Sequence, residues 1–199
     1  MAATCLVWLS PLGAQQLLDR IVAHAGGYAL TLTDVNAALG LGVIDAPAGA
    51  DREAVGVQRL IERQLVLAEV ARFSPPEPDA AEVDREVAVM KAHAGPRLAA
   101  VAESTGVDEV RIREIARETL RIRTYLNQRF GTTVQVSIEE AAQYYRIHPE
   151  EFMRDGAPIP FDEAEPEARQ RAAIERRALT IEQWIRDLRA RAEVVEIRR

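Results

Sequence analysis

The segment from Tyr144 to Phe152, YYRIHPEEF, gathers side chains that could transfer protons. His148 stands shortly before Glu150 and Glu151, and a histidine beside a carboxylate is a common acid–base pair. Such a pair needs an oriented partner and a pocket, and the sequence supplies no nucleophile or third group for it. A histidine at the end of a helix is instead favoured by the negative end of the helix dipole. We therefore predict a capping or surface role for His148 and no catalytic residue.

The remaining reactive residues form no recognisable site. The three histidines, His24, His93 and His148, are far apart, and the single Cys5 offers neither a CxxC pair nor an internal disulfide. The sequence contains no P-loop, no dinucleotide-binding glycine pattern and no GxSxG motif. These observations predict no metal site and no cofactor.

The composition is that of a folded soluble protein. Hydrophobic residues make up 48% and charged residues 28% of the 199 positions, which fits one domain or two small ones. The net charge of -6 argues against nucleic acid as a partner. An acidic segment, 139–167, precedes an arginine-rich tail, 169–199, and this pattern indicates solvated helix faces that pair with each other.

The first residues have the character of an export signal. Ala3 to Ala14 is apolar and uncharged and ends in small residues, like the second half of a secretory signal peptide. The basic region that opens such signals is missing. We therefore expect residues 1–14 to be a truncated or weak signal, with an unstructured N-terminus as the alternative, and 15–199 to form a single domain. This predicts a periplasmic or secreted protein. No stretch is long and apolar enough to predict an integral membrane segment.

The N-terminal half predicts a hairpin followed by helices. Residues on either side of Gly26-Gly27 alternate, and two glycines permit a tight turn. Thr33 is expected to cap a short helix that ends near Gly40 or Gly42. Apolar residues at three- and four-residue steps then predict further helices. These span 52–73, 79–94 with Asp79 as the cap, 97–104 and 108–130.

The C-terminal half predicts a small strand after Thr132 and a helix capped by Ser137 with Glu140, ending at His148 before Pro149. A heptad-like seam follows, with Trp184 at its edge, and predicts a helix that docks onto a neighbour. A closing strand is expected within 192–199. The seam residues are Ile174, Ala178, Ile181, Ile185, Leu188 and Ala192. The fold class is therefore mainly α with a few short β-strands.

The order of these elements resembles the SurA-type chaperones, the parvulin-linked chaperones of the bacterial envelope. The resemblance covers nearly the whole chain after residue 14. It implies a SurA- and trigger-factor-like helical module in which the C-terminal helix and strand, 167–199, pack back on the N-terminal hairpin. The segments that carry it are DRIVAHAGGYALTLTDV, VQRLIERQLVLAEVAR, SIEEAAQYYRIHPEEF and IEQWIRDLRARAEVVEIRR.

The chain departs from that family at one place. Only MRDGAPIP stands between Phe152 and Phe161, where the family normally has an isomerase domain. Such a domain needs on the order of a hundred residues. We therefore expect neither peptidyl-prolyl isomerase activity nor any other enzyme activity.

The resemblance implies a holdase that binds unfolded envelope or outer-membrane proteins in an apolar groove without ATP. Adaptable Met and aromatic side chains suit varied clients. One alternative is a structural or assembly partner for a single envelope protein, or a homodimer formed by strand or helix exchange. A further alternative is an active peptidyl-prolyl isomerase. The candidate peptide-binding residues are Met90, Tyr144, Tyr145, Phe152 and Trp184, with core packing as the alternative for each.

Overall fold

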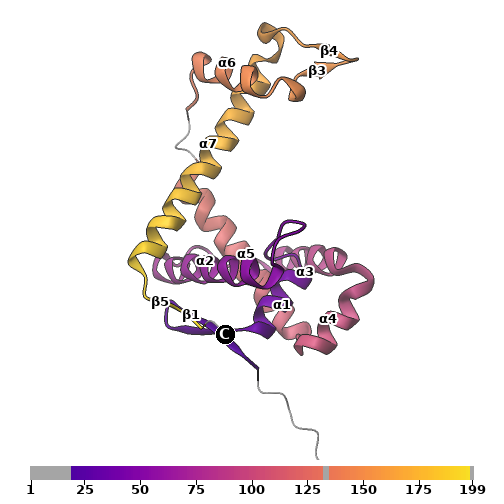
Figure 1. Cartoon of the computed structure of the whole chain (residues 1–199), viewed down its shortest axis with the longest axis vertical. Coiled ribbons are helices and arrows are strands. Elements are labelled where there is room, and N and C mark those ends of the chain that lie inside the picture. The colour runs from indigo at the N-terminus through magenta and orange to yellow at the C-terminus, as the bar shows by residue number, and fades with distance from the viewer. Residues whose placement is uncertain (1–18, 132–134, 198–199) are drawn as a thin grey trace, which may run out of the picture.

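The computed structural model describes residues 19–131 and 135–197, and these are mainly helical with a few short strands, which confirms the predicted fold class. Figure 1 shows a body that contains the sheet and the helices within residues 32–130, with a smaller lobe at the N-terminal end of the long helix α7 (Phe161–Arg191). The predicted signal segment, 1–14, lies outside the described residues. Among the described residues, none of the helices combines the length and the apolar character needed to cross a bilayer.

The N-terminal hairpin has the predicted position. β1 (Ile21–Ala25) pairs antiparallel with β2 (Tyr28–Thr31). The connecting residues, Gly26 and Gly27, have φ values of +58° and +84°. Two successive positive φ angles match the right-handed twist of the flanking strands, and glycine adopts them without steric cost.

Replacing Gly27 with alanine is expected to lower the free energy of unfolding by about 1 kcal/mol, because an alanine there must keep a positive φ. No atom lies within 4 Å of the added Cβ, so the effect comes from backbone conformation alone. Gly27→Asn should stay closer to the wild type, since asparagine tolerates the left-handed region. Urea denaturation of both variants checks this, and equal losses would contradict the conformational explanation.

The two ends of the described chain meet in one sheet, as predicted. β5 (Val194–Glu196) pairs antiparallel with β1, giving the strand order β2-β1-β5. The pairing continues beyond β5, because the Ile197 N–H donates to the Val22 carbonyl at 2.9 Å. The C-terminal strand therefore adds a third strand to the N-terminal hairpin, beside β1 (Figure 1).

The start of α1 (Leu32–Gly40) corrects one prediction: the cap is Thr31 and not Thr33. The Asp34 N–H donates to the Thr31 hydroxyl, and the Asp34 carboxylate accepts from the Thr31 N–H at 3.0 Å. Thr31 is favoured because the acid three residues later completes a reciprocal capping box. The Thr33 N–H instead donates to the Asp19 carboxylate at 3.2 Å.

The other helices of the body begin and end within a residue or two of the predicted positions. Aspartate N-caps start three of them, and each accepts from backbone N–H groups in the first turn. The elements are α2 (Arg52–Phe73), α3 (Ala80–Ala94), η1 (Gly95–Arg97), α4 (Leu98–Thr105) and α5 (Glu109–Phe130).

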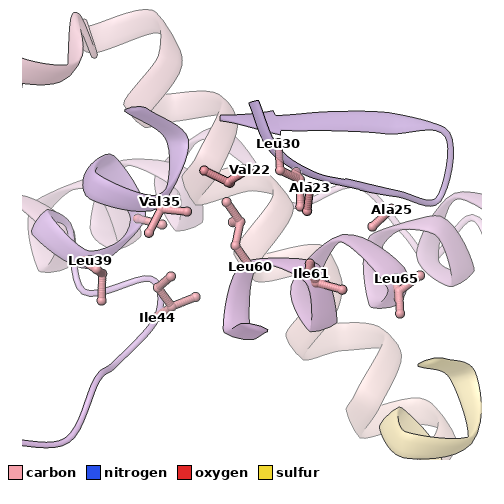
Figure 2. Packing of buried hydrophobic residues seen from close by; sticks show 11 residues of the cluster. Val22, Ala23, Ala25, Leu30, Val35, Leu39, Ile44, Leu60, Ile61 and Leu65 are labelled. Carbon is pink, nitrogen blue, oxygen red and sulfur yellow. The ribbon is translucent and has the colours of Figure 1, made fainter. Parts of the chain in front are cut away.

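Two hydrophobic clusters stabilise the body. In the first, side chains of the sheet and of α1 pack against α2 (Figure 2). Val22 and Ala23 are both buried there, although they are consecutive, because β1 changes register between Ile21 and Ala23. The second cluster joins α1, α3 and α5, and includes Val83, Val87, Met90, Ile112, Ile115 and Ala116.

The lobe contains α6 (Ile138–Ile147), η2 (Pro149–Glu151), β3 (Met153–Arg154), β4 (Ala157–Pro158) and the first half of α7. The capping box of Ser137 with Glu140 is present as predicted. The small strand expected before α6 is not found at 135–137, and 132–134 lie outside the described residues. The Gln135 carbonyl accepts from the Arg176 guanidinium at 3.1 Å, and so it bonds a helix side chain in place of a neighbouring strand.

α7 (Phe161–Arg191) is one continuous helix that starts well before the predicted seam. Its first half packs against α6 through Ala164, Ala168 and Ala172, and its second half packs against α2 and α5. Ile174 is 62% exposed, so the seam docks only from Ile181 onward. The C-terminal segment that was expected to begin at residue 167 therefore begins inside this helix.

Candidate functional site

The five residues predicted to bind peptides do not line a common groove. Met90 is buried in the α3–α5 cluster, and Trp184 is buried between α2, α5 and α7. Phe152 is buried in the core of the lobe, and Tyr144 and Tyr145 are partly buried and pack against that core. Met90, Phe152 and Trp184 are at most 8% exposed, so a ligand at the surface would not reach them. Core packing, the stated alternative, describes these three, because the largest apolar side chains gain most from burial.

Phe152 is the centre of the lobe. Its ring centroid lies 5.1 Å from that of Tyr145 and 6.2 Å from that of Tyr144, the second in an edge-on arrangement. The Arg171 guanidinium lies 5.1 Å from the same ring. The Tyr145 hydroxyl donates to the Ile159 carbonyl at 2.6 Å, which fixes the chain after the β3–β4 hairpin. These tyrosines therefore hold α6 against α7.

His148 is the C-terminal cap residue of α6, as predicted. Its Nδ1 lies 3.8 Å from a Glu150 oxygen and 4.0 Å from a Glu151 oxygen, beyond hydrogen-bonding distance. The Glu151 carboxylate instead accepts from Arg171 at 2.7 Å and from the Tyr144 hydroxyl at 2.9 Å. The arrangement is a structural network that links α6, η2 and α7.

Among the described residues, His148, Glu150 and Glu151 are the group whose ligand atoms come within 4.8 Å of one another and could hold a metal ion. The sequence reasoning did not predict this group. Glu151 is already paired with Arg171, and the positive guanidinium opposes a cation at the same carboxylate. The geometry favours the ion pair over a metal centre.

The Arg171 guanidinium, and then the Tyr144 hydroxyl, hold the pKa of Glu151 below its ordinary value of 4.5. Burial, and then the hydrogen bond to Glu151, raise the pKa of Tyr144. A carboxyl with a lowered pKa in the folded state stabilises that state above its unfolded pKa, and the contribution disappears as pH falls through the folded pKa.

We therefore expect the lobe to lose stability as the pH falls below the ordinary glutamate value of 4.5. Glu151→Gln should flatten this dependence, because the variant cannot gain a proton at that position. Glu150→Gln is the matched control, since the Glu150 side chain is 71% exposed and the adjacent carboxylate keeps its pair with Arg171. Urea unfolding followed over a pH series provides the measurement. A wild-type slope in Glu151→Gln would contradict the assignment.

An apolar groove lies elsewhere, between α2, α5, α7 and the loop 43–47 that follows α1. Its volume is about 520 Å³. Four charged side chains, Asp45, Arg59, Glu62 and Arg63, border it, and Arg59 pairs with Glu62 at 3.2 Å. The apolar lining consists of Val43, Ile44, Ala46, Pro47, Val66, Ile122, Leu126 and Ile185.

Local contacts fix both sides of this groove. The N–H groups of Val43 and Ile44 donate to the Ala38 carbonyl at 2.8 and 3.4 Å, which turns the loop back over α2. On the other side Trp184 packs between Tyr125 and Phe130, with ring centroids 5.9 and 5.4 Å apart. Docking of Trp184 positions the adjacent Ile185 at the groove.

Sequence reasoning missed the groove because its lining comes from four separate segments. The available signal was the wide apolar face of α2, where Val66, Leu67 and Val70 add to Leu60, Ile61 and Leu65, since such a face indicates a helix covered on more than one side. A scan against models of protein families and a search of curated proteins found no match for this chain.

Proposed function

We propose that this protein is an ATP-independent holdase chaperone that binds extended segments of unfolded envelope proteins. The observation that carries the proposal is the apolar groove of about 520 Å³ between α2, α5, α7 and the loop 43–47. The order of elements that resembles SurA-type chaperones supports it. The apolar segment Ala3 to Ala14 supports action in the periplasm.

The groove has the physical character that a client of varied sequence requires. Aliphatic side chains make up most of its apolar lining, and burial of a client's apolar groups there contributes about 25 cal/mol per Å². Arg59 and Glu62 place opposite charges at its border, so neither sign of client charge is excluded. Ordering of a flexible client opposes the contact energy, and we expect fast, reversible binding.

Suppression of aggregation tests the proposal. An outer-membrane protein diluted from denaturant should stay soluble in the presence of this protein, without nucleotide. Light scattering should fall as the molar ratio of chaperone to client rises. No reduction in scattering at severalfold molar excess would contradict the proposal. A globular protein of similar size and charge is the control.

A second candidate function is assembly with a specific partner or with another copy of this chain. The sheet favours it, because within the described residues β2 and β5 each pair along one edge only. Val195 and Ile197 also expose apolar side chains beside the outer edge. Unpaired edges are templates for strand addition. Sedimentation at increasing concentration, together with client range, separates the candidates: one saturable partner favours assembly, and many unfolded clients favour the holdase.

Isomerase activity is the least supported alternative. α6 and α7 are joined by η2 and a hairpin of two very short strands, β3 and β4, where the family has its inserted domain. We propose that the protein is not an enzyme. A proline-peptide isomerisation assay should therefore give the uncatalysed rate, and turnover above that rate would contradict this part of the proposal.

A further inference from the structure

A second cavity, of about 220 Å³, lies between β2, α1, α2, the α4–α5 turn and the start of α5. It is separate from the proposed client groove, although Val43 and Arg63 border both. The apolar part of its wall includes Leu30, Ala37, Leu60, Leu67, Val107 and Ile115. One end is polar and contains two arginines.

Arg63 is the buried charge at this polar end. Its side chain is only 11% exposed. Its hydrogen bonds within the described residues all start from Nη2, which donates to Thr119 Oγ1 at 3.0 Å and to the Ile115 carbonyl and a Glu118 oxygen at 3.4 Å. A guanidinium carries five N–H donors, so Nε and Nη1 keep donors for a further acceptor.

The carboxylate beside Arg63 is shared. Glu118 lies 3.4 Å from Arg63 Nη2, and its other oxygen lies 3.7 Å from Arg111, which also pairs with Glu114 at 3.1 Å. Asp34 also borders the cavity, but its carboxylate accepts from the Thr31 N–H and hydroxyl at the start of α1. Burial, together with the charge of Arg111, lowers the pKa of the Arg63 guanidinium, while Glu118 opposes that change. The Nε and Nη1 donors of Arg63 are therefore the groups that a further carboxylate would bind.

We propose that this cavity binds a small amphipathic carboxylate, with the carboxylate on Arg63 and the apolar group against Leu60, Leu67 and Val107. A guanidinium matches the two oxygens of a carboxylate and forms paired, charge-assisted hydrogen bonds with it. The volume suits an apolar group on the order of ten non-hydrogen atoms. The ligand is either a free carboxylic acid or the C-terminal residue of a peptide. The inference does not depend on the holdase function.

Titration of the full chain with hexanoate and with benzoate, followed by amide NMR shifts, tests the proposal. We expect saturable shifts at Ala37 and Val107, which line this cavity and not the client groove. Hexanol and benzyl alcohol lack the charge, so their affinity should be at least about tenfold lower. Absence of saturable shifts in the wild type, or equal binding of the alcohols, would overturn the proposal.

Substitution of single arginines tests which guanidinium binds the carboxylate. Arg63→Gln should weaken hexanoate binding by about tenfold or more, since it removes the charged partner. Arg59→Gln is the matched control on the same helix, because Arg59 does not line this cavity, and it should bind as the wild type does. Arg111→Gln, at a half-exposed position, gives a second test if Arg63→Gln does not fold, and it should also bind hexanoate more weakly. Unchanged binding in a folded Arg63→Gln, or in Arg111→Gln where Arg63→Gln does not fold, would contradict the assignment.

Two short peptides distinguish the sources of the carboxylate. A peptide with a free C-terminal leucine and the same peptide with an amidated terminus are titrated alongside hexanoate. Binding of the free-ended peptide alone assigns the site to chain termini, and binding of hexanoate without either peptide assigns it to small acids. Equal binding of the amidated and free-ended peptides would count against the proposal.

Discussion

Leu126→Glu is expected to reduce the suppression of client aggregation by about tenfold or more, because a carboxylate in an apolar site loses hydration without gaining a partner. Leu126 is half-buried and lines the groove beside Ile122 and Ile185. A carboxylate there can still reach solvent in the free protein, so the variant should remain folded. Light scattering of a diluted outer-membrane protein measures the effect, with circular dichroism to confirm the helical content.

Val110→Glu is the matched control for this substitution. It introduces the same charge on the same helix, at an exposed apolar position outside the groove. The variant should suppress aggregation as well as the wild type does. If Val110→Glu and Leu126→Glu lose activity to the same extent, net charge decides the effect and the groove does not.

Trp184→Ala is expected to lower the free energy of unfolding by about 3–5 kcal/mol, the usual range for removing a buried aromatic side chain. Trp184 packs against Tyr125 and Phe130, and the Arg129 guanidinium lies 5.3 Å from its ring. These contacts attach the second half of α7 to α2 and α5. The variant should therefore also weaken the groove, because Ile185 loses its support.

Leu179→Ala provides the comparison on the same helix. Leu179 is exposed, and its truncation should change the free energy of unfolding by less than about 0.5 kcal/mol. Guanidinium denaturation of both variants gives the two values. A loss of similar size in both would mean that helix propensity dominates and that Trp184 does not anchor α7.

Local signals in the sequence were sufficient for most of the fold. The glycine pair predicted the hairpin turn, Asp79 and Ser137 predicted helix starts, and the alternation near the C-terminus predicted the closing strand. These features depend on residues close in sequence, whose conformational preferences act locally. The choice of Thr31 over Thr33 as the first cap shows the limit, because two threonines only two positions apart can each cap the helix, and the acid three residues after Thr31 decides between them.

The candidate site could not be derived in the same way. Met90, Phe152 and Trp184 were chosen for chemical character, but the same character drives burial, and each one fills a different core. The groove depends on how α7 crosses α2 and α5. That crossing is set by contacts between residues more than fifty positions apart in sequence, such as Tyr125 and Trp184. No periodicity within a single helix contains this information.

Site-specific photocrosslinking tests most directly whether the groove receives an unfolded chain. A photoreactive phenylalanine analogue is placed at Arg59, on the border of the groove, and separately at Val110, on the exposed face of α5. The proposal predicts that an unfolded outer-membrane protein crosslinks from Arg59 and not from Val110, and that unlabelled client reduces the product. Equal crosslinking from both positions, or crosslinking from Val110 alone, would contradict it.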